Sequence, residues 1–283
     1  MTRAIIEMNS PMLSLIVVHY KSPDMLERCI ESLYRTIRKT PFEIIAVGSA
    51  SDGTAEKMLA QRFPDVRCIS FSRNIGYPKA VNAGIAKAQG DQLFILNHDI
   101  VATDGAIDEM ARFLANEGVK ARIGMLGPKL LDMRGQYQYS AFRFYTPFTI
   151  VARRTPLGKL PQGKRETERF LLKDKKIETA KAPQQADWLM GSALLVSRQA
   201  LNKVGLMDER FFMYFEDVDW ARRFWENNYS VVYFPQAVLH HVHGKASDVL
   251  GIFDVLFNRM TWIHLKSAAQ YFWKYKGKTD HYI

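Results

Sequence analysis

Three groups of side chains in this 283-residue chain could carry chemistry, and the first is a single aspartate. Asp99 follows the apolar run 93–96 after only two residues. This position would hold its carboxylate at the edge of a sheet, where an oxygen-binding metal such as Mg²⁺ or Mn²⁺ could be bound. Aspartate is also a common helix N-cap and turn residue. Asp99 is therefore a candidate metal ligand with a structural alternative.

The second group is a set of three acids, Glu216, Asp217 and Asp219, inside an aromatic segment. Neighbouring aromatic side chains exclude water from a carboxylate and raise its pKa toward that of a general base. A helix N-terminus, whose dipole favours acidic side chains, explains the same pattern, and both interpretations can hold together. The aromatic neighbours are Phe211, Phe212, Tyr214, Phe215 and Trp220.

The third group is His240, His241 and His243, which follow the apolar run 231–235. Neutral imidazoles are common ligands of Mn²⁺ and Zn²⁺. The spacing His-His-x-His is not a zinc signature, so a polar loop is the alternative interpretation.

The elements that must position these groups follow a strand and helix alternation in the first half of the chain. Apolar β-branched runs alternate with segments that have helical spacing, such as Leu26, Ile30, Leu33 and Ile37. This alternation predicts an α/β fold with a mostly parallel sheet covered by helices. Ligands bind at the carboxyl ends of such strands, which here are the polar loops 19–24, 48–53 and 97–99. The predicted strands are 13–18, 43–47, 67–71 and 92–96, and the predicted helices are 25–37, 55–62 and 79–89.

The alternation stops near residue 120. The charged stretch 155–176, which contains Pro and Gly, is expected to form a mobile loop or an irregular hairpin. A buried strand is expected within 186–198, a helix at 198–204 and a further strand at 229–235. We therefore expect one large domain over 1–248, with halves at about 12–120 and 121–248, followed by a helical segment over 249–283.

Composition excludes several classes of protein. Hydrophobic residues make up 47% and charged residues 24% of the chain, which argues against intrinsic disorder and fibrous structure. Two cysteines, Cys29 and Cys68, are too few for a disulfide scaffold and favour a reducing compartment, with the cytoplasm as the expectation. The first twelve residues lack a signal-peptide pattern, and no apolar run reaches the ~18 residues of a spanning helix.

The net charge of +10 is concentrated in two segments. Residues 152–181 hold ten basic and four acidic side chains, and residues 249–283 hold five and two. Positive charge attracts anions in general, but few aromatic residues and no recognised motif accompany the first segment, so nucleic acid is not expected as a partner. The second segment either lies on a membrane surface as a basic aromatic helix or packs on the domain. Its relevant side chains are Phe257, Trp262, Phe272 and Trp273 with Arg259, Lys266, Lys274 and Lys276.

Taken in order, three segments over about residues 12–275 resemble one known family. They are LSLIVVHYKSPDMLERCIESL, FSRNIGYPKAVNAGIAKAQGDQLFILNHD and GLMDERFFMYFEDVDWARRFWENNYSVVYFPQAVLHHVHG. Together they are similar to the inverting nucleotide-sugar glycosyltransferases of family 2, which have the GT-A fold, and in particular to the rhamnosyltransferase-like branch. The resemblance implies a catalytic domain over 1–248 with a nucleotide-sugar-binding half and an acceptor-binding half.

The resemblance also implies roles for individual residues. Asn97 and Asp99 match the metal-binding motif, and Asp99 would hold Mg²⁺ or Mn²⁺ together with His241, although His240 and His243 are close enough to compete. Asp217 matches the catalytic base. The implied acceptor-binding residues are Trp188, Gly191, Ser192 and Glu216. The implied donor-binding residues are His19, Tyr20, Lys21, Ser49, Asn74, Gly76, Lys79, Asn82, Asn97, His98 and Asp99.

The chain departs from the family pattern at three positions. Gly48 stands where the aspartate that bonds the nucleotide base is usual, Lys21 replaces the usual Asn, and Asn97 replaces the first metal-motif Asp. A lysine at position 21 could contact phosphate instead.

The resemblance implies a hexosyltransferase that moves L-rhamnose from dTDP-L-rhamnose, or a sugar from UDP, to a glycan or lipid-linked glycan of a bacterial surface polysaccharide such as O-antigen. A catalytically degraded binding protein of the same fold is the alternative. Peripheral association with the inner face of the cell membrane and a homodimer are further expectations.

Overall fold

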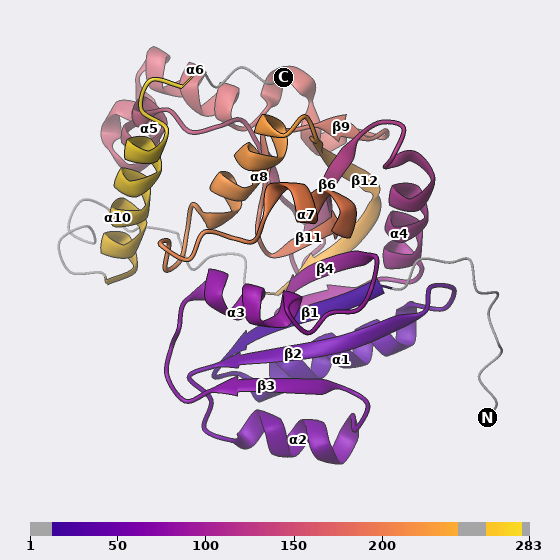
Figure 1. Ribbon diagram of the computed structural model, residues 1–283. Coiled ribbons are helices and arrows are strands. Elements are labelled where there is room, and N and C mark those ends of the chain that lie inside the picture. The colour runs from indigo at the N-terminus through magenta and orange to yellow at the C-terminus, as the bar shows by residue number, and fades with distance from the viewer. Residues whose placement is uncertain (1–12, 243–258, 279–283) are drawn as a thin grey trace.

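One mixed sheet dominates the computed structural model, which describes residues 13–242 and 259–278 (Figure 1). Ten described strands belong to it, in the order β3-β2-β1-β4-β11-β6-β12-β5, with β7 paired to β6 and β9 paired to β12. A separate two-stranded sheet joins β8 (Ala141–Phe142) to β10 (Trp188–Leu189). The predicted α/β class with a mostly parallel central sheet is confirmed.

The first half follows the predicted alternation closely. Its four strands pair in parallel, because a helix between each strand and the next returns the chain to the same end of the sheet. Pro23 at the start of α1 and Pro78 near the start of α3 suit a first helical turn, where a missing N–H costs nothing. The elements are β1 (Leu13–Tyr20), α1 (Pro23–Thr36), β2 (Phe42–Ser49), α2 (Thr54–Arg62), β3 (Arg67–Phe71), α3 (Tyr77–Ile85) and β4 (Gln92–Asn97).

The second half extends this sheet with a different pattern. β11 runs antiparallel between β4 and β6, and β12 runs parallel to β6 with a register shift between Phe234 and Val238. The elements are β5 (Ile100–Ala102), α4 (Ala106–Glu117), β6 (Ile123–Leu131), β7 (Tyr137–Gln138), β9 (Gln184–Gln185), β11 (Ala193–Ser197), α7 (Arg198–Val204), α8 (Glu216–Glu226) and β12 (Ser230–His241).

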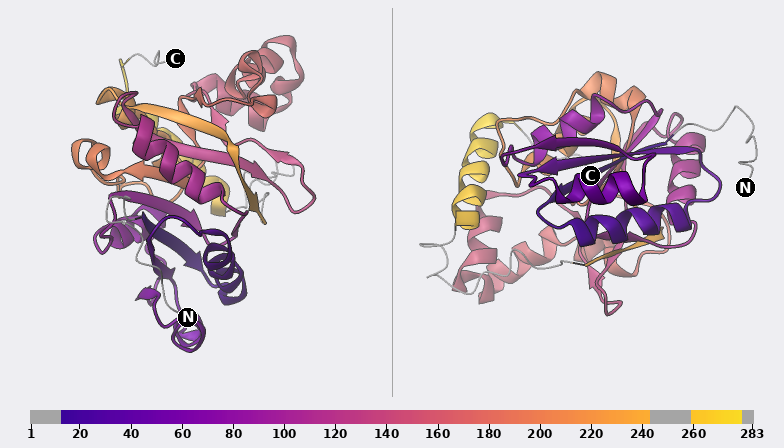
Figure 2. Two further views of the ribbon diagram at one scale, coloured as in Figure 1. Left: turned by 90° about the vertical axis from the view of Figure 1, so that its right-hand side faces the viewer. Right: turned by 90° about the horizontal axis from the view of Figure 1, so that it is seen from below.

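Helices cover both faces of the sheet (Figure 2). Apolar side chains of α1, α2 and α4 form one buried cluster with the strands, and those of α3, α7 and α8 form the other. Leu15 and Ile16, which are neighbours in β1, point into different clusters because successive strand residues face opposite sides. Both faces of the central strands are thus buried, which explains their continuous apolar sequence.

The expectation of a loop or hairpin over 155–176 is wrong, because this region is helical. α5 (Pro147–Arg154) and α6 (Pro161–Phe170) are followed by short 3₁₀ turns at Lys173–Lys175 and Ile177–Thr179, and another turn lies at Pro156–Lys159. A capping box between Thr146 and Thr149 starts α5, and Glu166 of α6 accepts hydrogen bonds from both threonines. Phe170, Leu172 and Ile177 are buried. These few apolar anchors order a segment whose charge suggested a loop.

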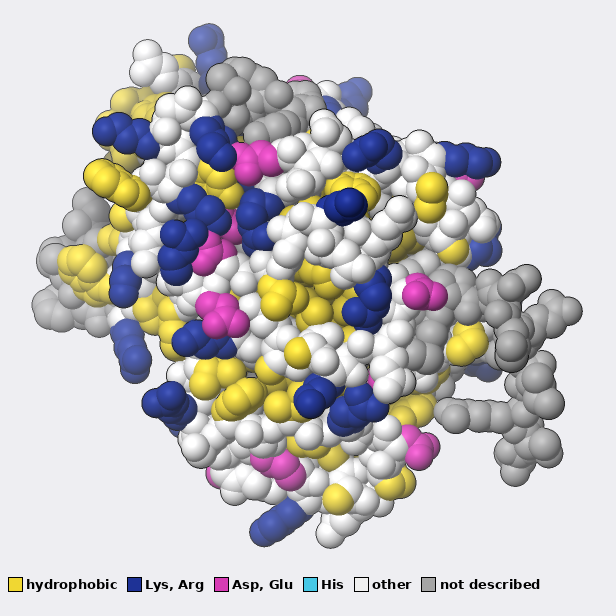
Figure 3. Space-filling model, in the orientation of Figure 1, with side chains coloured by type: hydrophobic (Ala, Val, Ile, Leu, Met, Phe, Trp, Pro, Cys, Tyr) yellow, Lys and Arg dark blue, Asp and Glu magenta, His cyan; other side chains and the backbone are white. Residues whose placement is uncertain are grey.

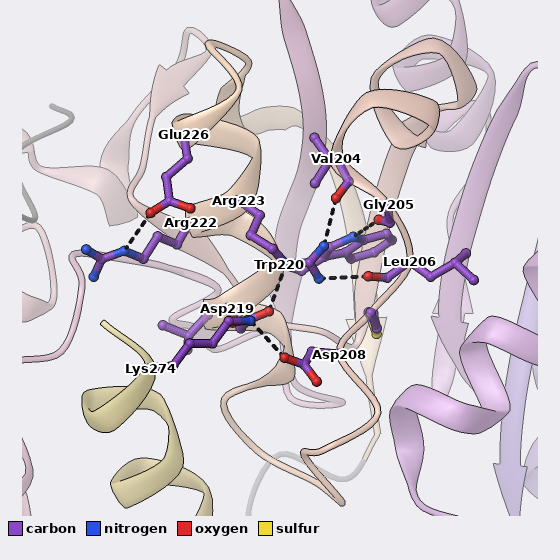
Figure 4. Close-up of polar contacts among 12 residues, drawn as sticks. Val204, Gly205, Leu206, Asp208, Asp219, Trp220, Arg222, Arg223, Glu226 and Lys274 are labelled. Carbon is purple, nitrogen blue, oxygen red and sulfur yellow. Dashed lines mark hydrogen bonds and ion pairs between the residues drawn. The ribbon is translucent and has the colours of Figure 1, made fainter. Parts of the chain in front are cut away.

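The C-terminal helix α10 (Arg259–Lys274) packs on the rest of the fold, as one of the two alternatives predicted. Lys274 forms ion pairs with Asp208 and with the fully buried Asp219 of α8, as Figure 4 shows. The Tyr275 hydroxyl donates to Asp219 over 2.8 Å. Within the described residues, no helix is both long enough and apolar enough to cross a membrane. Phe257 lies outside the described residues.

Candidate active site

The loops predicted to carry chemistry meet at one edge of the sheet. In the β1–β2 pair Tyr20 lies opposite Ser49, and in the β1–β4 pair Val18 lies opposite Asn97. The backbone N–H of His98 donates to the Val18 carbonyl over 3.1 Å, and its ring Nδ1 lies 3.2 Å from the same oxygen. The carboxyl ends of β1, β2 and β4 are therefore adjacent, as expected for a parallel sheet.

The His19 side chain lies against Gly48, which explains why a glycine stands at this position. A Cβ at position 48 would lie 2.7 Å from Nε2 and 3.0 Å from Cε1 of His19, so an aspartate there would require the imidazole to move. His19 is buried, and neither ring nitrogen has a partner among the described residues. Burial, and next the charge of His98, lowers the pKa of His19 to about 4. The ring is therefore neutral near pH 7 and carries an unused donor and an unused acceptor.

The remaining candidate donor residues lie in different parts of this region. Ser49 contacts Asn74 through a 3.3 Å hydrogen bond, and the exposed Tyr20 and Lys21 lie beside them at the end of β1. Lys79 is exposed on α3. Asn82, in contrast, is buried, and its side-chain amide forms hydrogen bonds with Met207 and Glu209. It therefore joins α3 to the segment before α8 and lies outside the site.

Gly76 is required by its position. Its φ is +84°, and a Cβ there would lie 2.6 Å from the Phe212 carbonyl oxygen. The same carbonyl accepts a hydrogen bond from the Tyr77 N–H over 2.9 Å. Gly76 therefore allows the start of α3 to contact the segment that leads into α8.

Asp99 and His241 lie close together across the β5–β12 pair. Nε2 of His241 is 3.3 Å from Oδ2 of Asp99, and its Nδ1 is 2.9 Å from Oε1 of Gln138. Burial raises the pKa of Asp99, but the hydrogen bond and charge of His241 outweigh it, and the pKa lies below its ordinary value. Oδ1 of Asp99 is buried without a partner in the described part of the chain.

His240 does not share this arrangement. His240 directs Nδ1 toward the Asp132 carbonyl oxygen, 3.2 Å away, because neighbouring strand residues face opposite sides. His243 lies outside the described residues. Residues 13–242 and 259–278 contain no group of three or more His, Cys, Asp or Glu side chains arranged to hold a metal ion. Asp99 and His241 are two candidate ligand side chains, and Mg²⁺ is often held by one or two carboxylates together with substrate phosphate oxygens.

Asp217 lies at the start of α8 against the β10–β11 loop. Its Oδ2 accepts a 2.9 Å hydrogen bond from the Gly191 N–H, and its Oδ1 accepts from the Val218 N–H. Burial, opposed by these hydrogen bonds, raises the pKa of Asp217 to about 6. Burial and then the charge of Asp217 raise the pKa of Glu216 well above its ordinary value. A neutral Glu216 beside a titratable Asp217 is an arrangement suited to proton transfer near neutral pH.

Tyr77 connects these groups and was not predicted from the sequence. Its hydroxyl donates to the Gly191 carbonyl over 2.6 Å, on the same peptide segment that binds Asp217. Burial and then the charges of Glu216, Asp217 and Asp99 raise the pKa of Tyr77. A helix-start tyrosine has no sequence signal for such a role, and neither has Gln138 in the short strand β7.

The acceptor-side candidates are all buried, and they lie in β10, in the β10–β11 loop and at the start of α8. The Ser192 carbonyl accepts from the Asn97 N–H over 2.9 Å, which links the loop to the end of β4. The Ser192 hydroxyl is buried without a partner among the described residues. Trp188 stacks on Phe142 with centroids 4.5 Å apart, and its Nε1 donates to the Arg143 carbonyl. Its indole is thus part of the core that supports the site.

The backbone that leads into α8 is held in an unusual conformation. Tyr214 and Phe215 both have φ of +67°, a left-handed conformation that costs non-glycine residues roughly 1–2 kcal/mol each. Phe215 is 2% exposed and packs against Tyr145, His264 and Tyr271. This aromatic packing maintains the conformation that turns Glu216 and Asp217 toward the Gly191 loop.

Comparisons with known proteins agree with the fold and show the family. A family model described as Glycosyl transferase family 2 matches residues 14–204. The chain is 32% identical over 249 residues to an N-acetylglucosaminyl-diphospho-decaprenol L-rhamnosyltransferase of Mycobacterium tuberculosis, which covers 83% of this chain and 78% of that one. It is 22% identical to the dTDP-rhamnosyl transferase RfbF of Shigella flexneri, over 87% and 74% of the two chains.

A solved structure supports the same fold at low sequence identity. The structure of GalNAc-T7 with UDP, GalNAc and Mn²⁺ matches with a TM-score of 0.62 and 16% identity, and covers 84% of this chain and 44% of that chain. The likeness extends over less than half of that protein and concerns the fold alone.

The sheet, the site at its carboxyl edge and these matches define a glycosyltransferase of the GT-A fold. The chain belongs to glycosyl transferase family 2 and is similar to its rhamnosyltransferases. Its relatives support a role in sugar transfer during polysaccharide synthesis. The alternative of a degraded binding protein is not needed.

Proposed function

We propose that this chain is an inverting rhamnosyltransferase that uses dTDP-L-rhamnose and a lipid-linked or soluble glycan acceptor of a bacterial surface polysaccharide. The observation that carries the proposal is the pair of hydrogen bonds at the Gly191 peptide segment, where Asp217 Oδ2 accepts from the Gly191 N–H and the Gly191 carbonyl accepts from the Tyr77 hydroxyl. The names of the two rhamnosyltransferase relatives favour L-rhamnose as the sugar.

Asp217 acts as the catalytic base. It takes the proton of an acceptor hydroxyl as that oxygen attacks the anomeric carbon from the face opposite the nucleoside diphosphate. A new C–O bond forms, the bond from the sugar to the diphosphate breaks, and the anomeric configuration is inverted. A pKa of about 6 suits this role, because the carboxylate is ionised near pH 7 yet basic enough to accept a proton. The Gly191 N–H directs Oδ2, and the Tyr77 hydroxyl fixes the Gly191 peptide.

Asp99 and His241 would hold Mg²⁺ or Mn²⁺ beside the donor diphosphate. The unpartnered Oδ1 of Asp99 and the nearby Nε2 of His241 are suitable ligand atoms, and Gln138 holds the imidazole by its other nitrogen. A divalent ion bound there would offset the charge that develops on the departing nucleotide. Asn97, at the end of β4, supplies no carboxylate, so the remaining ligands would come from the phosphates.

His19 takes the place of the missing aspartate in base recognition. Its neutral ring has a free donor and a free acceptor, and Gly48 leaves room for it. A pyrimidine base presents both a donor and acceptors on its edge, so an imidazole can bond to it. Lys21, at the exposed end of β1, is near enough to the β2–α2 loop to interact with Asp52 and is available to phosphate.

Calorimetric titration of the full chain with dTDP, UDP and GDP, each with and without Mn²⁺, tests the donor proposal. We expect dTDP to bind with a clear Mn²⁺ dependence, and Asp99→Ala to lose that dependence while it retains the weaker metal-free binding. If UDP binds more tightly than dTDP, the donor would be a UDP-sugar rather than dTDP-L-rhamnose. Absence of binding by all three nucleotides would contradict the assignment of the donor site.

A further inference from the structure

The exposed side of α10 is an amphipathic stripe of unusual composition. Residues spaced by three or four along this helix and its final turn are exposed, while Ser267, Ala268 and Tyr271 on the opposite side are buried. The sequence 259–278 contains no acidic residue. The exposed stripe consists of Arg259, Trp262, Lys266, Ala269, Trp273 and Lys276.

The two tryptophans of the stripe are far more exposed than the core packing of α10 requires. Trp262 is 56% and Trp273 80% exposed, and they lie eleven residues apart, which returns to nearly the same side of a helix. The Lys276 ammonium lies 5.7 Å from the Trp273 ring centre. Figure 3 shows hydrophobic and basic side chains alternating along the left edge of the view, where Figure 1 has α10.

A neighbouring segment has the same composition. Phe148, Val151, Leu157 and Leu160 of α5 and the turn after it are between 39% and 53% exposed. Residues 147–165 contain no acidic side chain and include exposed Arg153, Lys159, Lys164 and Arg165. Burial, and next the charges of Arg154 and Arg153, lower the pKa of His264 of α10 to about 3, so α10 lies near the end of α5. Figures 1 and 2 show both segments at the same end of the molecule.

We propose that the α10 stripe, supported by the exposed apolar corner 147–160, docks this enzyme on an anionic lipid bilayer. Tryptophan is enriched at membrane interfaces because its ring is amphipathic, and lysine and arginine beside it pair with anionic head groups. Val151, Leu157 and Leu160 of the α5 corner are aliphatic and cannot stack on a base. A lipid surface therefore accounts for them as well as for the rings of Phe148, Trp262 and Trp273, whereas single-stranded nucleic acid accounts for the rings alone.

The stripe lies directly behind the acceptor side of the site. The Ser267 hydroxyl donates to the Met213 carbonyl over 2.9 Å, and the His264 ring lies 5.2 Å from the rings of Tyr214 and Phe215. Met213, Tyr214 and Phe215 are the residues that lead into Glu216 and Asp217 at the start of α8. Docking through α10 would therefore hold the catalytic base close to the membrane surface, where a lipid-linked acceptor has its sugar.

Sedimentation of the full chain with vesicles tests this inference without any nucleotide sugar, so its result is independent of the transfer reaction. We expect binding to vesicles of phosphatidylcholine with phosphatidylglycerol, little binding to phosphatidylcholine alone, and loss of binding as salt rises. Lys266→Glu should weaken binding on the order of tenfold or more. Trp262→Ala and Trp273→Ala should each weaken it about tenfold.

Matched controls come from exposed residues elsewhere. Lys57→Glu on α2 and Met133→Ala in the β6–β7 turn, where Met133 is 62% exposed, should leave vesicle binding unchanged. Quenching of tryptophan fluorescence by brominated lipid gives a readout on the unaltered chain, and it should fall in the Trp262→Ala, Trp273→Ala double variant. Equal effects of Lys57→Glu and Lys266→Glu, absence of quenching, or binding to an oligonucleotide but not to vesicles would overturn the proposal.

Discussion

Replacing Asp217 by asparagine should strongly reduce sugar transfer and, at the same time, stabilise the folded chain at alkaline pH. Asparagine keeps the shape of the side chain, and its one oxygen can accept from the Gly191 N–H, while the Val218 N–H loses its acceptor at a cost of about 1 kcal/mol. It removes the buried charge and the proposed base. The effect on folding is thus opposite to the effect on catalysis, which separates a functional carboxylate from a structural one.

The magnitude follows from the pKa of this carboxyl group. Its value of about 6 in the folded chain compares with an ordinary value of 3.8. Each unit corresponds to about 1.4 kcal/mol, so the ionised side chain costs the folded state about 3 kcal/mol at pH 8. The cost is absent below the unfolded pKa, grows as pH rises from about 4 to 6, and reaches about half its full value near pH 5.

Asp219, two residues further along α8, provides the matched control. It is fully buried and accepts from Arg223 over 2.9 Å, from the Tyr275 hydroxyl and from Lys274, as Figure 4 shows in part. Removing one partner of a buried ion pair destabilises a protein by roughly 3–5 kcal/mol, and the partial exposure of Lys274 and Arg223 favours the lower end. Asp219→Asn should therefore lower stability by about 3 kcal/mol.

Urea unfolding of the native chain and both variants at pH 8 and pH 5, together with a transfer assay, measures these effects. After the lost Val218 hydrogen bond is subtracted, we expect Asp217→Asn to gain about 2 kcal/mol at pH 8 and about 0.5 kcal/mol at pH 5. Transfer should fall on the order of 10²–10⁴-fold. The reasoning is refuted if Asp217→Asn is less stable than the native chain at pH 8, or if it retains near-normal transfer.

Further predictions concern pH, the imidazole of the metal site and the nucleotide base. The kcat/KM for transfer should fall about tenfold per pH unit below pH 6 as Asp217 is protonated, and a profile flat to pH 4 would exclude it as the base. Gln138→Ala frees the His241 ring and should weaken Mn²⁺-dependent dTDP binding roughly 10–100-fold in calorimetry, with metal-free binding unchanged. Gly48→Asp should impair dTDP binding, because its Cβ would lie 2.7 Å from His19 Nε2. A second substitution, His19→Ser, in the same chain should restore part of the affinity. Tighter dTDP binding by Gly48→Asp alone would contradict the proposed role of His19.

Much of the first half could be predicted because its signals are local. The apolar β-branched runs and the helical spacing of Leu26, Ile30 and Leu33 depend on residues close together in the sequence, and the structure has β1 and α1 at these positions. Polar residues at strand ends predicted the edge of the sheet where Asp99 lies. The helical form of 147–179 was missed, since it depends on a few buried side chains such as Phe170 among many charges.

The sequence by itself determined which residues end each strand and hence the family to which the chain belongs. Only the tertiary structure decided which of them meet. Gly191 donates to Asp217 across 26 residues, and Gln138 holds His241 across 103, distances over which no local pattern carries information. The pKa of Asp217 likewise depends on burial by packed neighbours, because desolvation is a property of the assembled fold rather than of the residue.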